Sequence, residues 1–291
     1  MLPTNRRDFL RGSLAVGSAA ALPVSAWPAQ VRRASDVIEL GPTKVKVSRM
    51  LLGSGTFGGG NSSNQMRKLG AEGLADVWLT AFENGVFVWD TADTYGSHAA
   101  VKAALNLKKI PREKVTVLTK TSARNADDMK ASLDRYLQEM GTDYIDIVLL
   151  HARMSPQWDQ LDKGCMDVLS EAKQAKKVRA VGISCHSVAA MGVAAKSPWL
   201  DVCLCRVNYA GIRMDVTDVA DLLPALAELR KAGKGVLAMK VLGEGQLRDK
   251  LDDALRFIVT KNVVDAFTIG VESKDDLKDL LERIPKVSQQ A

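Results

Sequence analysis

Hydrophobic and polar residues along this chain follow two periods, one typical of strands and one typical of helices. Amphipathic stretches with apolar residues at helical spacing lie at 126–140, 216–232 and 273–284, and the stretch at 98–107 is a weaker helix candidate. Short apolar runs predict eight strands, near residues 50–53, 86–90, 115–119, 144–150, 178–183, 201–207, 235–239 and 265–269. The repeated alternation of strand and helix predicts a parallel sheet.

Eight strand–helix units favour a closed (β/α)8 TIM barrel, and an open doubly wound sheet is the alternative. Residues 37–50 form two alternating runs that are split by Gly41-Pro42-Thr43, which is the pattern of a β-hairpin. We expect this hairpin to cap the bottom of the barrel. The barrel domain is predicted to span residues 37–288, with no second domain inside it.

The first residues have the three parts of an export signal. Arg6 and Arg7 precede Phe9-Leu10, an apolar stretch follows at 14–24, and a small-residue site ends at Ala26. The stretch is too short to span a bilayer comfortably, and the paired arginines resemble the bacterial twin-arginine signal, whose pathway carries folded proteins. An amphipathic helix or a retained anchor is the alternative reading.

This reading predicts a twin-arginine signal peptide at 1–26 and a linker at 27–36. It also predicts that the chain passes through the twin-arginine export machinery to the periplasm or beyond. No other segment is apolar enough to cross a membrane, so we expect no stable membrane span after cleavage.

Composition does not alter the predicted fold. The chain has 291 residues, of which 46% are hydrophobic and 25% charged, the usual globular range. The formal net charge is +6, and the first 26 residues, with three arginines and one aspartate, contribute +2 of it and leave +4. That charge is too mild to indicate nucleic-acid binding, and no basic stripe interleaved with aromatic residues is present.

The cysteines do not form a metal-binding pattern. There are four, with no C-x-x-C pair, and the chain has only three histidines, which argues against a zinc or iron–sulfur site. Cys203 and Cys205 lie two residues apart in an apolar run, so they should share one face of a strand as small buried residues. Cys165 and Cys185 complete the set.

A glycine-rich loop follows the first predicted strand. Gly53-Ser54-Gly55-Thr56-Phe57-Gly58 matches the G-x-G-x-x-G pattern of Rossmann dinucleotide sites. That motif should open a helix, whereas here it continues into more Gly, Asn and Ser residues. We therefore expect a loop above a barrel strand that lines a cofactor cleft.

Four polar residues come at or just after the ends of three consecutive predicted strands. Asp90 ends the second strand, Lys120 the third and His151 the fourth, and Tyr95 lies in the loop after Asp90. Barrel enzymes place their active sites at this carboxyl-terminal face. Each residue also has a structural explanation, as a turn former, a solvated side chain or a rim residue, but their arrival at one rim favours a shared site.

The chemistry of the four residues is coherent. A tyrosine phenol has a pKa of about 10, and a neighbouring ammonium such as that of Lys120 lowers it. Asp90 can supply the counter-ion that Lys120 needs. His151 can donate a hydrogen bond to a substrate oxygen, and Tyr95 can protonate that oxygen as hydride arrives at carbon.

These residues resemble those of the aldo/keto reductase family over about 37–284. The motifs that carry the resemblance are Gly53-Ser54-Gly55-Thr56, Asp90-Thr91-Ala92…Tyr95-Gly96, Thr119-Lys120 and Leu149-Leu150-His151. The resemblance implies an eight-stranded barrel, a small carbonyl or alcohol substrate, a metal-free nicotinamide cofactor with NADP(H) preferred over NAD(H), and catalysis by Asp90, Tyr95, Lys120 and His151.

The cofactor side departs from the family pattern. Ser184 is kept, but Cys185 stands where Asn is usual, and Arg206 stands where Gln is usual. Met239 replaces the tyrosine that stacks on the nicotinamide. Near the C-terminus Glu272 would repel a phosphate, while Lys274 could substitute for the family's basic residue. The candidate cofactor-binding residues are Gly55, Thr56, Ser184, Cys185, Arg206, Met239, Lys240, Leu242 and Lys274.

Three functions compete. The first is an NAD(P)H-dependent oxidoreductase that reduces aldehydes or ketones, or works in reverse, with Tyr95 as general acid or base. The second is an exported barrel that binds a ligand or partner without nicotinamide turnover, because free cofactor is scarce outside the cytoplasm. The third is an enzyme that is loaded with tightly held cofactor before export.

Overall fold

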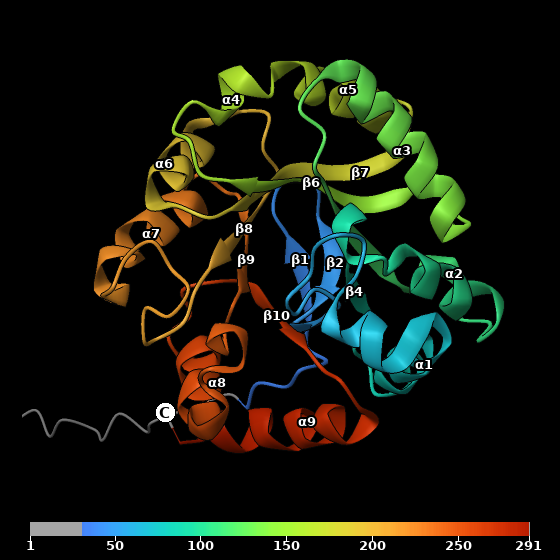
Figure 1. The fold of residues 1–291 in the computed structure, drawn as a ribbon. Coiled ribbons are helices and arrows are strands. Elements are labelled where there is room, and N and C mark those ends of the chain that lie inside the picture. Colours follow the sequence, from blue (N-terminus) through green and yellow to red (C-terminus); the bar gives the residue numbers. More distant parts are fainter. Residues whose placement is uncertain (1–30, 291) are drawn as a thin grey trace, which may run out of the picture.

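The eight predicted strands close into one parallel barrel, which confirms the (β/α)8 prediction (Figure 1). The computed structural model describes residues 31–290, so the signal peptide and the start of the linker lie outside the described residues. β10 pairs with both β9 and β3, which closes the ring. The barrel strands are β3 (Met50–Gly53), β4 (Val88–Asp90), β5 (Thr116–Thr121), β6 (Ile145–Arg153), β7 (Val178–Cys185), β8 (Val202–Arg206), β9 (Gly235–Met239) and β10 (Ala266–Gly270).

Helices surround the barrel (Figure 1). The weak candidate at 98–107 is a helix, whereas the helix predicted at 216–232 begins only at Leu223. Pro224 lies in its first turn, where proline is favoured, and a separate 3₁₀ turn precedes it. The helices are α1 (Asn64–Glu83), α2 (His98–Asn106), α3 (Ala126–Met140), α4 (Trp158–Leu161), α5 (Lys163–Gln174), α6 (Val188–Lys196), α7 (Leu223–Lys231), α8 (Leu251–Thr260) and α9 (Lys274–Ser288).

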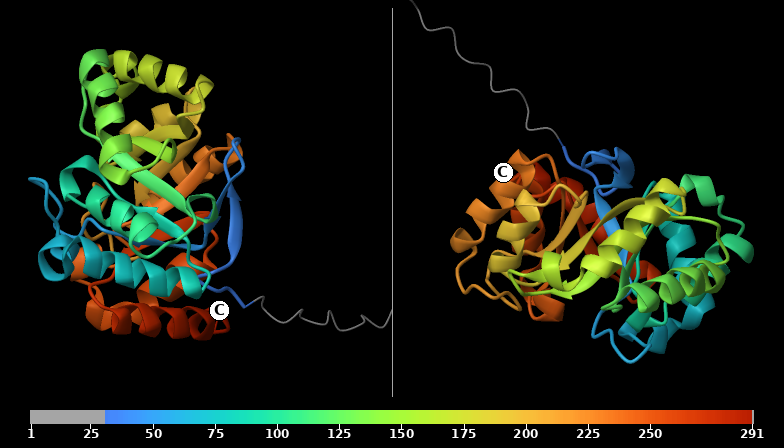
Figure 2. Two further views of the ribbon diagram at one scale, coloured as in Figure 1. Left: turned by 90° about the vertical axis from the view of Figure 1, so that its right-hand side faces the viewer. Right: turned by 90° about the horizontal axis from the view of Figure 1, so that it is seen from above.

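The N-terminal hairpin closes the bottom of the barrel, as predicted. β1 (Val37–Leu40) and β2 (Val45–Ser48) pair antiparallel, and Leu40 and Val47 are fully buried in the cluster that fills the barrel interior. Figure 2 shows this hairpin at the end opposite to the loop that follows β3. The barrel is therefore plugged by apolar side chains at one end and open for chemistry at the other.

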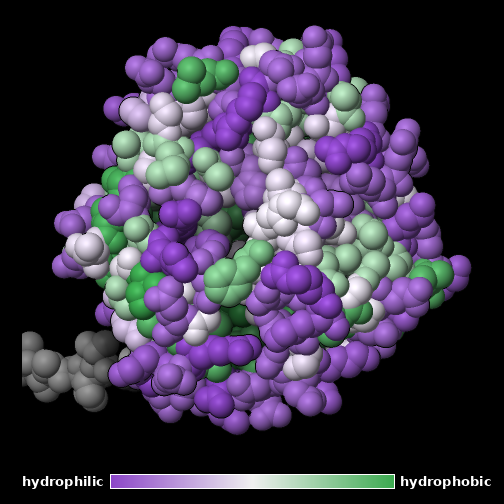
Figure 3. All heavy atoms as spheres, viewed as in Figure 1, coloured by the Kyte–Doolittle hydropathy of each residue, from purple (hydrophilic) through white to green (hydrophobic). Residues whose placement is uncertain are grey.

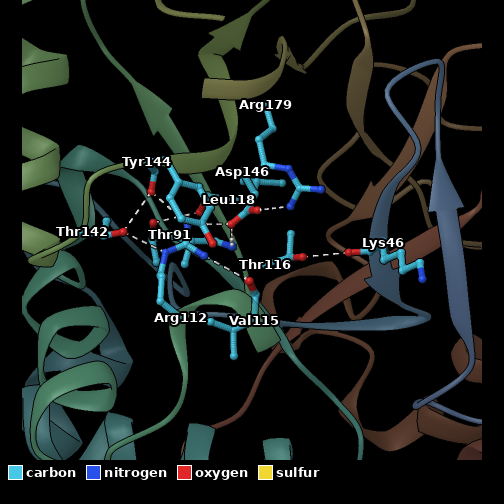
Figure 4. Close-up of polar contacts among 11 residues, drawn as sticks. Lys46, Thr91, Arg112, Val115, Thr116, Leu118, Thr142, Tyr144, Asp146 and Arg179 are labelled. Carbon is cyan, nitrogen blue, oxygen red and sulfur yellow. Dashed lines mark hydrogen bonds and ion pairs between the residues drawn. The ribbon is translucent and has the colours of Figure 1, made fainter. Parts of the chain in front are cut away.

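A buried carboxylate ties the strands together near the amino-terminal ends of β5 and β6 (Figure 4). Asp146 has no exposed surface and accepts hydrogen bonds from Arg112 Nη2 at 2.7 Å, Arg179 Nη1 at 2.6 Å and the backbone N–H of Val117 at 2.9 Å. Nearby, the Thr116 hydroxyl donates to the Lys46 carbonyl of the hairpin. A buried charge is tolerated only when it is paired and hydrogen-bonded in this way.

Three cysteines gather in the layer between the barrel and its helices. Cys185 and Cys205 are partners across β7 and β8, and the Sγ atoms of Cys203 and Cys205 lie 3.4 Å apart. All three are buried with the outer core, which confirms that Cys203 and Cys205 share one face of their strand. The thiols are free, and they behave as small apolar side chains.

Candidate active site

The four residues predicted from strand ends come together at the open end of the barrel. Asp90 is the last residue of β4, Lys120 lies near the end of β5, and His151 lies near the end of β6. Tyr95 ends the 3₁₀ turn Asp93–Tyr95 that follows β4. The topology therefore places all four side chains at one rim.

Lys120 forms the buried base of this group. Its Nζ donates to the Asp90 carboxylate and to the Thr91 carbonyl, the latter at 2.8 Å. The side chains of Lys120 and Asp90 are only 2% and 7% exposed. Burial lowers the pKa of Lys120, but Asp90 and the other acidic groups around it together raise it by more, so the lysine stays charged.

Tyr95 lies above this ion pair. Its Oη is 3.3 Å from Nε2 of His151, and Lys120 Nζ lies 5.0 Å from the centre of its ring. Burial raises the pKa of Tyr95, while the charge of Lys120 lowers it by less. The effect of Lys120 alone predicts a more acidic phenol, but burial outweighs it, so the phenol is protonated at neutral pH.

His151 is uncharged. Burial lowers its pKa to about 2, and the neighbouring charge of Lys120 acts in the same direction. A neutral imidazole beside a protonated phenol can donate or accept a hydrogen bond, depending on which ring nitrogen carries the proton.

A β-bulge sets the direction of the His151 side chain. Leu150 pairs with Ile183, and the next pair joins Arg153 to Cys185, so β6 has one extra residue there. Ala152 has a φ of 56°, a left-handed conformation that is unusual for alanine. Bulges redirect side chains next to functional sites, and this one follows His151 directly.

The glycine-rich loop packs on Tyr95 and does not open a helix, because α1 begins only at Asn64. A Cβ atom on Gly55 would lie 2.1 Å from the Tyr95 ring, and one on Gly58 would lie 2.5 Å from it. Such contacts are far shorter than packing allows. The G-x-G-x-x-G pattern therefore makes room for the Tyr95 ring, and the Rossmann reading does not apply.

A cleft of about 480 Å³ runs from this group toward α9. Figure 3 shows that this face of the molecule is hollowed over the open end of the barrel. The cleft reaches α9 through the residues that follow β9 and β10. Predicted residues that line it are Asp90, Tyr95, Lys120, Gly55, Thr56, Met239, Lys240 and Leu242.

The other four predicted cofactor residues lie outside the lining of the cleft. Ser184 is buried behind Met239, with Oγ 4.0 Å from its sulfur. Arg206 directs Nη2 to Nδ1 of His186 at 2.6 Å, and its buried Nε has no partner in the part of the chain that the structure describes. Lys274 is exposed at the start of α9. Cys185 points into the outer core, because it alternates with the inward-facing Ser184.

Three polar residues that line the cleft, Asn64, Lys68 and Glu244, were not predicted from the sequence. Lys68 and Asn64 of α1 both contact Glu272, which follows β10. Glu244 pairs with Lys240 and Arg213. The first contact joins residues 204 positions apart, so no local pattern could have revealed it.

Two kinds of feature are absent from the described residues. Across residues 31–290, His, Cys, Asp and Glu side chains do not gather in threes in a way that could hold a metal ion. Over the same range, none of the helices combines the length and apolarity needed to cross a membrane.

The comparison with family models gives two matches. The model of the aldo/keto reductase family matches residues 49–288. The model of the TAT (twin-arginine translocation) pathway signal sequence matches residues 3–23. The second match indicates export through the twin-arginine pathway, to the periplasm or beyond.

Curated relatives match over part of their length. An NADH-specific methylglyoxal reductase of Escherichia coli (strain K12) is 31% identical over 166 residues, which cover 50% of this chain and 50% of that protein. An aldo-keto reductase of Mycobacterium avium (strain 104) is 33% identical over 119 residues, covering 40% of this chain and 41% of that protein. The chain thus spans about half the length, or less, of these relatives.

Solved structures share the fold. An aldo-keto reductase from Pseudomonas aeruginosa superposes with a TM-score of 0.71 at 22% identity, covering 88% of this chain and 98% of that one. The holo form of an aldo-keto reductase from Bacillus halodurans gives a TM-score of 0.68 at 17% identity, covering 88% and 96%.

Proposed function

Because this chain belongs to the aldo/keto reductase family, we propose that it is an NAD(P)H-dependent oxidoreductase that reduces an aldehyde or ketone to an alcohol, or catalyses the reverse, with Tyr95 as general acid or base. One observation carries the proposal. Tyr95 Oη lies 3.3 Å from His151 Nε2, above the buried ion pair of Lys120 and Asp90. This short distance supports a site in which one carbonyl oxygen contacts both a proton donor and a second polar group.

The roles of the four residues follow from their charge states. Neutral His151 orients the carbonyl through a hydrogen bond from Nε2, and protonated Tyr95 transfers its proton to the same oxygen. Lys120 stabilises the phenolate that remains, since its ammonium lies 5.0 Å from the ring centre. Asp90 keeps Lys120 charged and in place. A bound nicotinamide would supply the hydride to the carbonyl carbon.

The cleft fits a nicotinamide nucleotide. Gly53 and Gly270 line it. A Cβ atom on Gly53 would lie 2.9 Å from Thr268 Oγ1, and one on Gly270 would lie 2.5 Å from Thr56 Oγ1, so only glycine fits at these two positions. Thr268 lines the cleft, and its buried Oγ1 has no hydrogen-bond partner among the described residues. For contact with the nucleotide we propose Gly55, Thr56, Met239, Lys240 and Leu242, with Ser184 and Arg206 beside them. Cys185, which is buried in the outer core, and Lys274, which does not line the cleft, are not among these residues.

For the exported protein we propose cleavage near Ala26 and a cofactor that is bound before export and then retained. The barrel is complete within residues 37–288, and residues ahead of it also pack on it: the Arg32 backbone N–H donates to Ser288 Oγ, and Ala34 is buried. A nucleotide that remains on the protein through gel filtration, identified by absorbance and mass, would support retention.

The proposed reaction is tested with Tyr95→Phe. We expect turnover to fall by about 10²- to 10⁴-fold while nucleotide binding persists, because only the transferable proton is removed. Methylglyoxal is the first carbonyl to test, since one relative is named for its reduction. Retained turnover in the variant would exclude Tyr95 as the acid. Absence of nicotinamide binding in the wild type would favour the exported barrel that binds another ligand.

A further inference from the structure

The end of the cleft that is remote from Tyr95 is acidic. Three carboxylates line it, those of Glu272, Asp276 and Asp279, together with the basic side chains of Lys68 and Arg248. A nicotinamide nucleotide with its reactive ring at Tyr95 must extend toward this end, because the cleft runs from Tyr95 to α9. The adenosine half would therefore meet these charges.

Glu272 is held in place as a hydrogen-bond acceptor. The Asn64 side chain donates to its Oε1 at 3.1 Å, and Lys68 forms an ion pair with its other oxygen. The Glu272 side chain is only 13% exposed, whereas that of Lys68 is 58% exposed. Of the two basic side chains at this end, Lys68 is thus already engaged by a carboxylate that is better buried.

The N-terminus of α9 is also engaged by the protein's own side chains. Ser273 Oγ accepts from the Asp276 backbone N–H at 3.0 Å, and the Asp276 carboxylate accepts from the Glu272 N–H at 3.0 Å. Asp275 and Asp276 both lie in the first helical turn. A helix N-terminus attracts phosphate through its N–H groups and dipole, and these carboxylates offset that attraction.

We propose that this cleft selects NADH over NADPH, with Glu272 as the residue that determines the choice. An ionised carboxylate accepts hydrogen bonds from the ribose hydroxyls of NADH and repels the 2′-phosphate of NADPH. The proposal rests on the proposed function and reverses the preference for NADP(H) that the family resemblance implied. The exposed Lys274, which could have held that phosphate, does not line the cleft.

Equilibrium binding of NADH and NADPH to the purified, nucleotide-free protein tests the proposal. We expect NADH to bind at least about tenfold more tightly, which corresponds to one repulsive contact. Raising the salt concentration should narrow the difference because it screens the repulsion. NADPH binding as tightly as NADH would overturn the proposal and leave the proposed function standing, whereas binding of neither would overturn both.

The variant Glu272→Gln locates the effect. It keeps the shape of the side chain and removes its charge, so NADPH affinity should rise about tenfold while NADH affinity rises little or falls. Glu244→Gln is the matched control, because Glu244 also lines the cleft but pairs with Lys240 and Arg213 away from the acidic end. The control should change both affinities by the same factor. An unchanged NADH-to-NADPH ratio in Glu272→Gln would contradict the assignment to Glu272.

Discussion

Tyr95 Oη and His151 Nε2 lie 3.3 Å apart, and both side chains are uncharged in this site. Burial raises the pKa of the phenol and lowers that of the imidazole to about 2. The two groups are therefore in the protonation states that the proposed carbonyl reduction needs at neutral pH, without any prior proton transfer.

This relationship predicts a simple pH profile. The kcat/KM of carbonyl reduction should be flat from about pH 5 through neutrality, with no inflection near 6.5, the ordinary value of histidine. It should fall only in the alkaline range, as the phenol, whose pKa is raised above about 10, loses its proton. Alcohol oxidation should show the opposite slope because it needs the phenolate. A step near pH 6.5 that disappears in His151→Gln would refute the neutral imidazole.

Replacing the buried lysine should destabilise the whole barrel. Lys120→Met leaves the Asp90 carboxylate buried without its partner, so the free energy of unfolding should fall by about 3 to 5 kcal/mol. Urea denaturation measures this. Adding Asp90→Asn to the same variant removes the uncompensated charge and should restore part of the loss. If the double variant were as unstable as the single one, charge burial would not be the cause.

The contact between the glycine loop and Tyr95 can be tested with a matched pair of alanines. In Gly58→Ala the new methyl group would meet the Tyr95 ring at 2.5 Å, so the ring must move and turnover should fall by about 10- to 100-fold. In Gly59→Ala, none of the described residues beyond the two chain neighbours comes within 4 Å of the new methyl group, so this variant should behave like the wild type. Equal losses in both variants would indicate a general effect on the loop.

The carboxylate near the other end of the barrel should matter for stability alone. Asp146→Asn removes the charge that pairs with Arg112 and Arg179, and we expect a loss of about 3 kcal/mol in the free energy of unfolding. Turnover of the folded fraction should be unchanged. Asp167→Asn, at an exposed pair with Lys163, is the control and should cost less than about 1 kcal/mol.

The barrel could be predicted from the sequence because its strands are short apolar runs that are clearly separated from one another. Asp90, Lys120 and His151 could be assigned to one rim for the same reason, since each comes at the end of such a run. The helix predicted at 216–232 started too early because a separate 3₁₀ turn comes before Leu223, and periodicity does not distinguish the two.

The rest depends on contacts that no local pattern contains. The bulge that follows His151 becomes visible only in the pairing of β6 with β7, and Glu272 meets Lys68 across 204 residues. The position of Cys185 could have been predicted, because side chains alternate along a strand and the adjacent Ser184 and Cys185 cannot both face the cofactor. The net rise of the Tyr95 pKa could not be predicted either, because the sequence does not show how deeply this side chain is buried.

The three clustered thiols determine the order in which the protein should fold and be exported. Oxidising compartments convert accessible cysteines to disulfides, and Cys185, Cys203 and Cys205 lie within 21 positions of sequence. A chain that reached such a compartment unfolded would expose all of them to mispairing with one another. The folded barrel keeps these thiols buried beneath its helices. Folding before transport across the membrane therefore preserves the native thiols. The twin-arginine route, matched at residues 3–23, follows that order.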